Sequence, residues 1–127
     1  MSKSRPIFLN LWHIKLPPSG MVSILHRLSG VLMVLALPVA AMLFELALTD
    51  TDGFNAVAAV LNSWPITLAL LLLLWSLLHH LLAGLRHLLL DLDIGLDRPI
   101  ARRTAQIVLI AAPTFTVALL AVGRFFA

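Results

Sequence analysis

Residues 64–90, WPITLALLLLLWSLLHHLLAGLRHLLL, decide the fold of this chain, because they form a continuous apolar stretch with ionisable groups near one end. About 20 apolar residues are enough for a helix to cross the hydrocarbon core of a bilayer. The ionisable residues of the stretch are His79, His80, Arg86 and His87. Such groups are costly at membrane depth unless they are paired or ligated. The stretch therefore predicts a membrane-spanning helix that carries a functional site.

The spacing of these residues divides them between two faces of the helix. At about 100° per residue, His80, Gly84 and His87 share one face, while His79 and Arg86 lie on an adjacent face. A glycine one turn from a histidine lets either a flat ligand, such as a porphyrin, or a partner helix approach the backbone. A single histidine would fit interhelical hydrogen bonding, but three in nine residues favour metal ligation.

The composition identifies an integral membrane protein and excludes several kinds of site. Of the 127 residues, 61% are hydrophobic and only 12% are charged, with a mean hydropathy of +1.01, well above that of soluble domains. The sequence has no cysteine, which excludes iron–sulfur clusters, disulfides and thiolate nucleophiles. It also has no glycine-rich phosphate loop between a strand and a helix.

The expected fold is all-α, with one domain over residues 1–127 and three transmembrane helices. Pro17 and Pro18 disfavour a helix before Ser19, which we expect to cap the first helix. Pro113 is expected to interrupt the third helix. The three spans are expected at about residues 23–48, 64–90 and 104–126, with an acidic turn at 49–53, an interfacial amphipathic segment at 54–61 and a helix-breaking loop at 91–103.

Basic residues flank the expected spans unevenly. The N-terminal segment and the first span contain Lys3, Arg5, Lys15 and Arg27, and the second loop contains Arg98, Arg102 and Arg103. The first loop has none, and Arg124 is a single charge at the other side. By the positive-inside rule, the N-terminus is expected to be cytoplasmic and the C-terminus periplasmic in a bacterial inner membrane. The net charge of +3 is then a matter of topology rather than of nucleic-acid binding.

A second polar cluster is expected at the depth of the histidines. Ser23, His26 and Arg27 are spaced i, i+3 and i+4, where the first span enters the cytoplasmic side of the membrane. A hydroxyl, an imidazole and a guanidinium suit hydrogen bonding to a quinone carbonyl, and the two cations suit haem propionates. The alternative is that His26 and Arg27 simply reach lipid headgroups at the interface. Three helices bury little, so further membrane helices from a partner subunit are expected.

Two segments resemble the cytochrome b subunit of succinate dehydrogenase. They are SILHRLSG at residues 23–30, preceded by Arg5-Pro6, and HLLAGLRH at residues 80–87, followed by Asp91. The resemblance covers nearly the whole chain. It implies an all-helical membrane anchor with three spans that pairs with a smaller anchor subunit, an iron–sulfur subunit and a flavoprotein subunit.

The resemblance also implies site residues, position by position. His80 is similar to the axial ligand of a haem b iron, with His79 and His87 as weaker alternatives. Ser23 and Arg27 resemble residues of the ubiquinone site, and His26 with Arg27 resembles contacts to the haem propionates. A second axial ligand would come from the partner anchor, because an electron-transfer haem b normally has two and only one well-placed histidine comes from this span.

The expected function is that of the membrane anchor of succinate:quinone oxidoreductase, in which the chain binds haem b and helps to reduce ubiquinone. Succinate oxidation itself would take place in the flavoprotein, so this chain alone is not catalytic for that step. One alternative is the anchor of a quinol:fumarate reductase. The other is a three-span scaffold or transporter component without redox function, whose histidines pack helices or relay protons.

Overall fold

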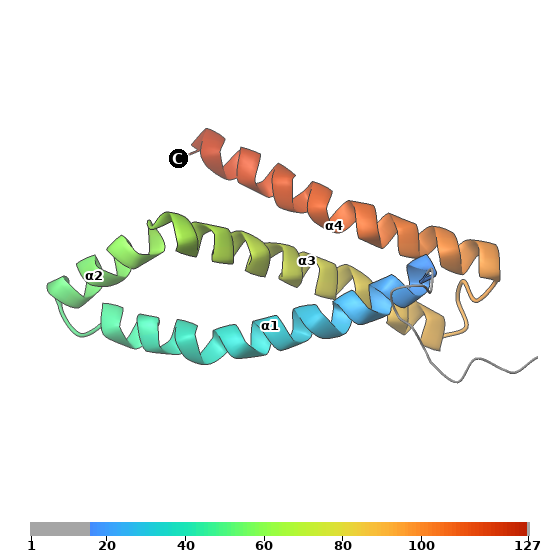
Figure 1. The fold of residues 1–127 in the computed structure, drawn as a ribbon, viewed down its shortest axis with the longest axis horizontal. Helices are drawn as coiled ribbons and strands as arrows, with labels where there is room; N and C mark the ends of the chain where they lie inside the picture. The colour runs from blue at the N-terminus through green and yellow to red at the C-terminus, as the bar shows by residue number, and fades with distance from the viewer. Residues whose placement is uncertain (1–15, 127) are drawn as a thin grey trace, which may run out of the picture.

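The computed structural model of the chain describes the backbone of residues 16–126 and the side chains of residues 16–123, and helices are the only regular secondary structure within these residues. These are α1 (Pro18–Ala47), α2 (Thr51–Leu61), α3 (Trp64–Asp91) and α4 (Arg98–Phe126). In Figure 1, α1 and α3 run in opposite directions, α2 joins them at one end of the molecule, and α4 returns alongside α3. The predicted all-α fold is confirmed.

Three of the helices are long and apolar enough to cross a membrane. Their candidate spans contain 30, 28 and 26 residues, and the most apolar windows have hydropathies of 2.2, 2.1 and 2.1. Exposed leucine, isoleucine, valine and phenylalanine side chains cover their outward faces. Apolar surface of this extent is stable only against lipid or other membrane helices, so the chain is a multi-pass membrane protein.

The first helix begins at Pro18, two residues earlier than a Ser19 cap predicts, and Ser19 does not cap it. Pro17 is the extended residue before the helix, and Pro18 occupies the first turn. The carbonyl oxygen of Pro17 accepts hydrogen bonds from the backbone N–H groups of Gly20 and Met21. Proline suits this position because the first turn needs no N–H donor from it and its fixed φ is already helical.

The acidic stretch after α1 is part of a helix as well as a turn. The Asp50 carboxylate caps α2 by accepting a hydrogen bond of 2.7 Å from the backbone N–H of Gly53. The helix therefore starts at Thr51 rather than at Phe54, because the cap supplies a partner for a first-turn N–H group. The predicted short segment between the first two spans is confirmed as a helix with these wider bounds.

The loop between α3 and α4 is shorter than predicted. It covers residues 92–97 and turns through Asp93 and Gly95, which both have positive φ, at 61° and 82°. The loop was predicted to extend to residue 103 because it contains Pro99, but this proline lies in the first turn of α4, where proline is compatible. The expected interruption at Pro113 is also wrong, since α4 continues through it.

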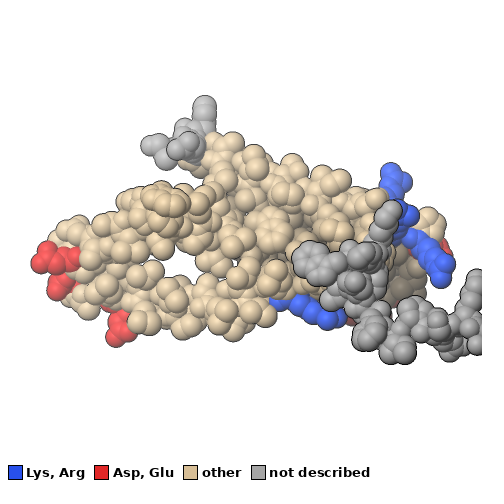
Figure 2. All heavy atoms as spheres, in the orientation of Figure 1, with Lys and Arg blue, Asp and Glu red and all other residues tan. Residues whose placement is uncertain are grey.

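The bundle is packed mainly in the half that contains the α3–α4 loop. Its core consists of Val22, Ala83, Ala105 and Val108. The remaining buried residues of α1 and α3 lie toward the same end. Figure 2 shows open gaps between α1 and the neighbouring helices nearer to α2. The helices are therefore joined firmly at one end and splay apart at the other.

Charged side chains are concentrated toward the two ends of the long axis of the molecule. In Figure 2, acidic side chains gather at the α2 end, and arginines gather toward the opposite end. The acidic residues of the α2 end are Glu45, Asp50 and Asp52. The other three, Asp91, Asp93 and Asp97, lie at the opposite end, where the more numerous arginines keep the balance of charge positive. The three membrane-spanning helices thus have a basic end and an acidic end, and the tightly packed half lies at the basic end.

Candidate functional site

A cluster of three histidines lies where α1 crosses α3 near the basic end. The rings of His26 and His80 stack, with centroids 4.0 Å apart and planes inclined by 18°. The ring of His87 is tilted by 49° to that of His26, with centroids 5.1 Å apart. The structure therefore brings together one histidine of the first predicted cluster and two of the second.

Two glycines make this crossing possible. A Cβ atom at Gly30 of α1 would lie 3.1 Å from Cε1 of His80, and one at Gly84 of α3 would lie 3.4 Å from Nε2 of His26. Each glycine thus makes room for the histidine of the opposite helix. The sequence left open whether Gly84 makes room for a flat ligand or for a second helix. In the structure, Gly84 makes room for a second helix, α1.

The Nδ1 atom of His80 is held by α1. It lies 3.0 Å from the carbonyl oxygen of His26 and 3.2 Å from Oγ of Ser29. A carbonyl oxygen only accepts hydrogen bonds, so the proton of a neutral His80 ring is on Nδ1. The Ser29 hydroxyl donates to the same carbonyl at 2.8 Å. Consequently Nε2 of His80 carries the lone pair that could bind a metal ion.

His79 lies in a different environment from its neighbour. Its side chain is 1% exposed, whereas that of His80 is only half-buried. The ring stacks on Trp75 with centroids 5.3 Å apart, and its Nε2 atom is buried without a hydrogen-bond partner among the described residues. The two histidines are adjacent in the sequence and therefore point in different directions from the helix. His79 points into the bundle, and His80 lies at the boundary of the bundle.

His87 is half-buried, and its Nδ1 atom is buried without a hydrogen-bond partner in the described part of the chain. Buried polar atoms in native proteins nearly always have a partner. The ring lies beside His26 and on the same helical face as His80. His87 therefore carries a buried polar atom that the described residues leave unsatisfied, next to the stacked pair of His26 and His80.

Ser23 and Arg27 lie on α1 beside His26. The Arg27 side chain is exposed, and that of Ser23 is half-buried. They are four residues apart, so they occupy neighbouring positions along one helix face. Both are thus accessible to a ligand or subunit that covers this side of the crossing.

Sequence reasoning missed the role of Ser29 and Gly30. Both belong to the SILHRLSG segment, in which they follow His26 by three and four residues. This spacing puts them on the same helix face as His26, and that signal could have marked them. It could not have shown that they contact His80, because the contact depends on how α1 crosses α3.

Arg86 differs from the histidines because it joins α3 to α4. Its Nε atom donates to Oγ1 of Thr104 at 3.2 Å, and its Nη2 atom donates to the carbonyl oxygen of Ala101 at 3.0 Å. The side chain is 7% exposed. It therefore contributes to helix packing rather than to the histidine cluster.

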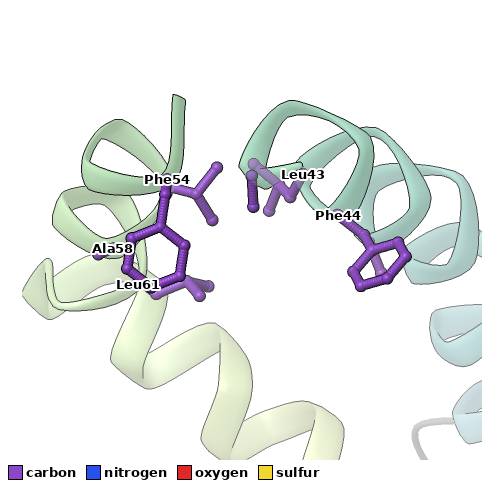
Figure 3. Close-up of a pocket in the computed structure, with 8 residues that line it drawn as sticks. Leu43, Phe44, Phe54, Ala58 and Leu61 are labelled. Atoms are coloured by element: carbon purple, nitrogen blue, oxygen red, sulfur yellow. The ribbon is translucent and has the colours of Figure 1, made fainter. Parts of the chain in front are cut away.

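A separate cavity of about 350 Å³ lies between α1 and α2, far from the histidines along the chain. Figure 3 shows Leu43 of α1 facing the α2 residues Phe54, Ala58 and Leu61, while the ring of Phe44 extends to the other side of α1. Its lining consists of apolar residues only. With no ionisable group it offers nothing for redox or acid–base chemistry, so the candidate site is the histidine crossing.

Within residues 16–126, no group of three or more His, Cys, Asp or Glu side chains is arranged to bind a metal ion. A metal centre formed by this chain would therefore need ligands from another molecule.

Comparisons with known proteins agree with this description. Residues 1–119 match the family model described as succinate dehydrogenase/fumarate reductase transmembrane subunit. The chain is similar to the succinate dehydrogenase cytochrome b556 subunit of Coxiella burnetii, with 34% identity over 88% of this chain and 90% of the relative. For the subunit of the same name from Paracoccus denitrificans, the identity is 32% over 81% and 79% of the two chains. The Rickettsia bellii subunit is 30% identical over 91% and 90%.

Replacing Gly30 by alanine is expected to weaken the crossing more than replacing Gly84. The added Cβ would lie 3.1 Å from His80 in the first case and at an ordinary contact distance of 3.4 Å from His26 in the second. Alanine has a higher helix propensity than glycine at both positions, so this contribution to stability cancels when the two variants are compared. Gly30→Ala should be less stable than Gly84→Ala by about 1–3 kcal/mol, measured by unfolding of the purified chain in detergent. Equal stabilities would contradict the proposed packing.

Proposed function

Because the chain belongs to the succinate dehydrogenase/fumarate reductase transmembrane subunit family, we propose that it anchors succinate dehydrogenase in the membrane. In this proposal it holds one haem b together with a second membrane subunit and forms part of the ubiquinone-reduction site. The whole chain acts as a single anchor domain. The observation that carries the proposal is the hydrogen bonding of His80. Its Nδ1 atom is bonded to the His26 carbonyl, which leaves the lone pair of Nε2 to bind a metal ion.

His80 fits an axial ligand of a haem iron better than its neighbours do. Ligating histidines generally donate their other ring N–H to a carbonyl or carboxylate, which fixes the tautomer and the orientation of the ring. His80 does so at 3.0 Å, and it lies at the boundary of the bundle. His79 faces Trp75 inside the bundle, and His87 lies about one turn before the helix end at Asp91. These differences support His80 over the two alternatives.

His26 and Arg27 fit the propionates of such a haem. Carboxylates pair well with guanidinium and imidazolium groups. The His26 ring stacks on that of His80, and the exposed Arg27 is the next residue of α1. When bound, a haem b supplies a centre that takes up and releases one electron.

Ser23 and Arg27 are proposed to bind ubiquinone at the cytoplasmic side. The Ser23 hydroxyl would donate a hydrogen bond to a quinone carbonyl, and Arg27 would stabilise the negative charge that develops on that oxygen as electrons arrive. The electrons must come from other subunits, because a chain without cysteine cannot ligate an iron–sulfur cluster. A flavoprotein, an iron–sulfur subunit and a smaller anchor are therefore the expected partners.

The anchor of a fumarate reductase remains the second candidate, because the family description covers both enzymes. The relatives described above are all named as succinate dehydrogenase subunits, which favours succinate oxidation as the physiological direction. The same helices and the same quinone site would serve the reverse reaction. The direction of turnover in membranes, measured with succinate and with fumarate, distinguishes the two.

A haem spectrum tests the assignment of His80. In the purified complex, His80→Ala should abolish or shift the absorbance band of the low-spin haem, because axial imidazole ligation sets the spin state. His79→Ala is the matched control, since the adjacent residue is buried against Trp75; it should leave the band largely intact. Loss of the band in His79→Ala alone would show that the ligand is assigned to the wrong residue.

A comparison of electron acceptors tests Ser23. Ser23→Ala should lower ubiquinone reduction roughly tenfold, which corresponds to about 1.4 kcal/mol of lost hydrogen bonding to a charged transition state. Succinate oxidation with an artificial acceptor at the flavin should be unchanged. Ser63→Ala, at the acidic end before α3, should affect neither activity. Unchanged ubiquinone reduction in an assembled Ser23→Ala complex would remove Ser23 from the site, and equal loss with both acceptors would indicate failed assembly.

Membrane orientation is tested by reporter fusions. We propose that the basic end faces the cytoplasm of a bacterium, because Arg98, Arg102 and Arg103 lie there and the first loop has no basic residue. Reporters fused within residues 49–62 and at residue 127 should be periplasmic. A reporter within residues 92–97 should be cytoplasmic. A cytoplasmic signal from residues 49–62 would reverse the proposed orientation.

A further inference from the structure

Ser29 lies at the junction of α1 and α3, and its side chain is fully buried, at 0% exposure. Its Oγ atom lies 2.8 Å from the carbonyl oxygen of His26 and 3.2 Å from Nδ1 of His80. The same carbonyl oxygen lies 3.0 Å from Nδ1 of His80. A hydroxyl of α1, a carbonyl of α1 and a ring nitrogen of α3 are therefore all within hydrogen-bond distance of one another.

The protons of this junction follow from the chemistry of its three atoms. A serine hydroxyl has one proton and two lone pairs, whereas a carbonyl oxygen only accepts hydrogen bonds. The Ser29 hydroxyl donates its proton to the His26 carbonyl, so the lone pairs of Oγ are available to accept. The Nδ1–H group of His80 is therefore shared between two acceptors, the carbonyl oxygen at 3.0 Å and Oγ at 3.2 Å. Hydrogen bonds with one donor and two acceptors are common at such sites in proteins.

The position of the Ser29 hydroxyl is fixed by α1 itself. Serine hydroxyls within helices often donate to a carbonyl about one turn earlier, and Ser29 does so with His26, three residues before it. The His80 ring also lies close to the α1 backbone at Gly30, where a Cβ atom would be 3.1 Å from Cε1 and 3.5 Å from Nδ1. The ring is thus in contact with a hydroxyl whose direction does not depend on the ring.

From this geometry we propose that Ser29 is a positioning residue for His80, whose hydroxyl fixes the orientation of the imidazole ring and lowers the reduction potential of the haem. The inference rests on the proposed function, in which Nε2 of His80 binds the haem iron. Acceptors at the outer ring nitrogen raise the basicity of the nitrogen that binds the metal. A more basic ligand favours the ferric over the ferrous iron, so a second acceptor lowers the potential.

Ser76 of α3 provides a matched control for Ser29. Its side chain is also 0% exposed, and it lies four residues before His80, where it is a neighbour of His80 on the helix surface. Its Oγ atom has no hydrogen-bond partner among the described residues. Ser76→Ala therefore removes a buried hydroxyl close to His80 without removing a hydrogen bond to the Nδ1 atom of that residue.

A redox titration of the purified complex, followed through the haem absorbance, tests the proposal. Ser29→Ala should shift the midpoint potential of the haem to more positive values, because Nδ1–H of His80 loses one of its acceptors. Ser76→Ala should leave the potential unchanged. The electron paramagnetic resonance spectrum of the oxidised haem, which depends on the axial ligands, should change in Ser29→Ala and stay the same in Ser76→Ala.

Ser29→Cys tests whether the hydrogen bond or the size of the side chain matters. The thiol fills the site but is only a weak donor and acceptor. Ser29→Cys should therefore shift the potential in the same direction as Ser29→Ala. It also decides the matter if Ser29→Ala retains no haem. An unchanged potential in Ser29→Cys would show that Ser29 only fills space.

The outcomes separate this proposal from the proposed function. A complex without haem, or a haem spectrum that is unchanged in His80→Ala, would refute the assignment of His80 and with it the role of Ser29. If His80→Ala changes the spectrum but Ser29→Ala and Ser29→Cys leave the potential unchanged, only the role of Ser29 is overturned. Equal shifts in Ser29→Ala and Ser76→Ala would assign the effect to the loss of any buried hydroxyl. A shift to more negative values in Ser29→Ala would contradict its role as an acceptor for Nδ1–H.

Discussion

The reciprocal contact between two histidines and two glycines is the constraint on which the rest of this structure depends. Gly30 receives His80, and Gly84 approaches His26. Association of helices in a membrane has no hydrophobic driving force, so it relies on close packing and hydrogen bonds. Here the close approach also lets the His26 carbonyl reach Nδ1 of His80. The contact that joins α1 to α3 therefore also fixes the tautomer of the proposed haem ligand.

Polar groups inside the bundle fall into two classes according to their partners. His80 Nδ1, Ser29 and Arg86 make hydrogen bonds to the backbone or side chains of other residues. Ser76 Oγ, His79 Nε2 and His87 Nδ1 are buried without a partner in the described part of the chain. The first class holds the helices together. The second class marks where water or another molecule must complete the structure, since unsatisfied buried groups are expensive.

The sequence predicted the elements of this fold far better than their contacts. The lengths of the apolar segments follow from hydropathy, and the positions of the basic residues are read directly from the sequence. The three spans were therefore predicted correctly. Errors at Ser19, Pro99 and Pro113 came from treating proline as a helix breaker, although Pro18 and Pro99 lie in first turns and α4 continues past Pro113. The rotation of about 100° per residue along a helix correctly placed His79 and His80 on different faces. The stacking of His26 on His80 could not be predicted from the sequence. The two residues are 54 positions apart and meet only because their helices cross.

The uneven packing of the bundle follows from where small residues occur. Ala83 and Ser76 of α3 and Ala105 of α4 are fully buried at helix contacts, whereas residues 70–74 of α3 are five consecutive leucines. Bulky side chains keep neighbouring helices apart, so α1 and α3 diverge beyond the last small residues. The leucine-rich half can still pack against lipid or helices of other subunits. The half that contains His80 is instead closely packed, and the proposed metal ligand needs such packing, because a ligand is positioned by residues whose own rotamers are fixed by their neighbours.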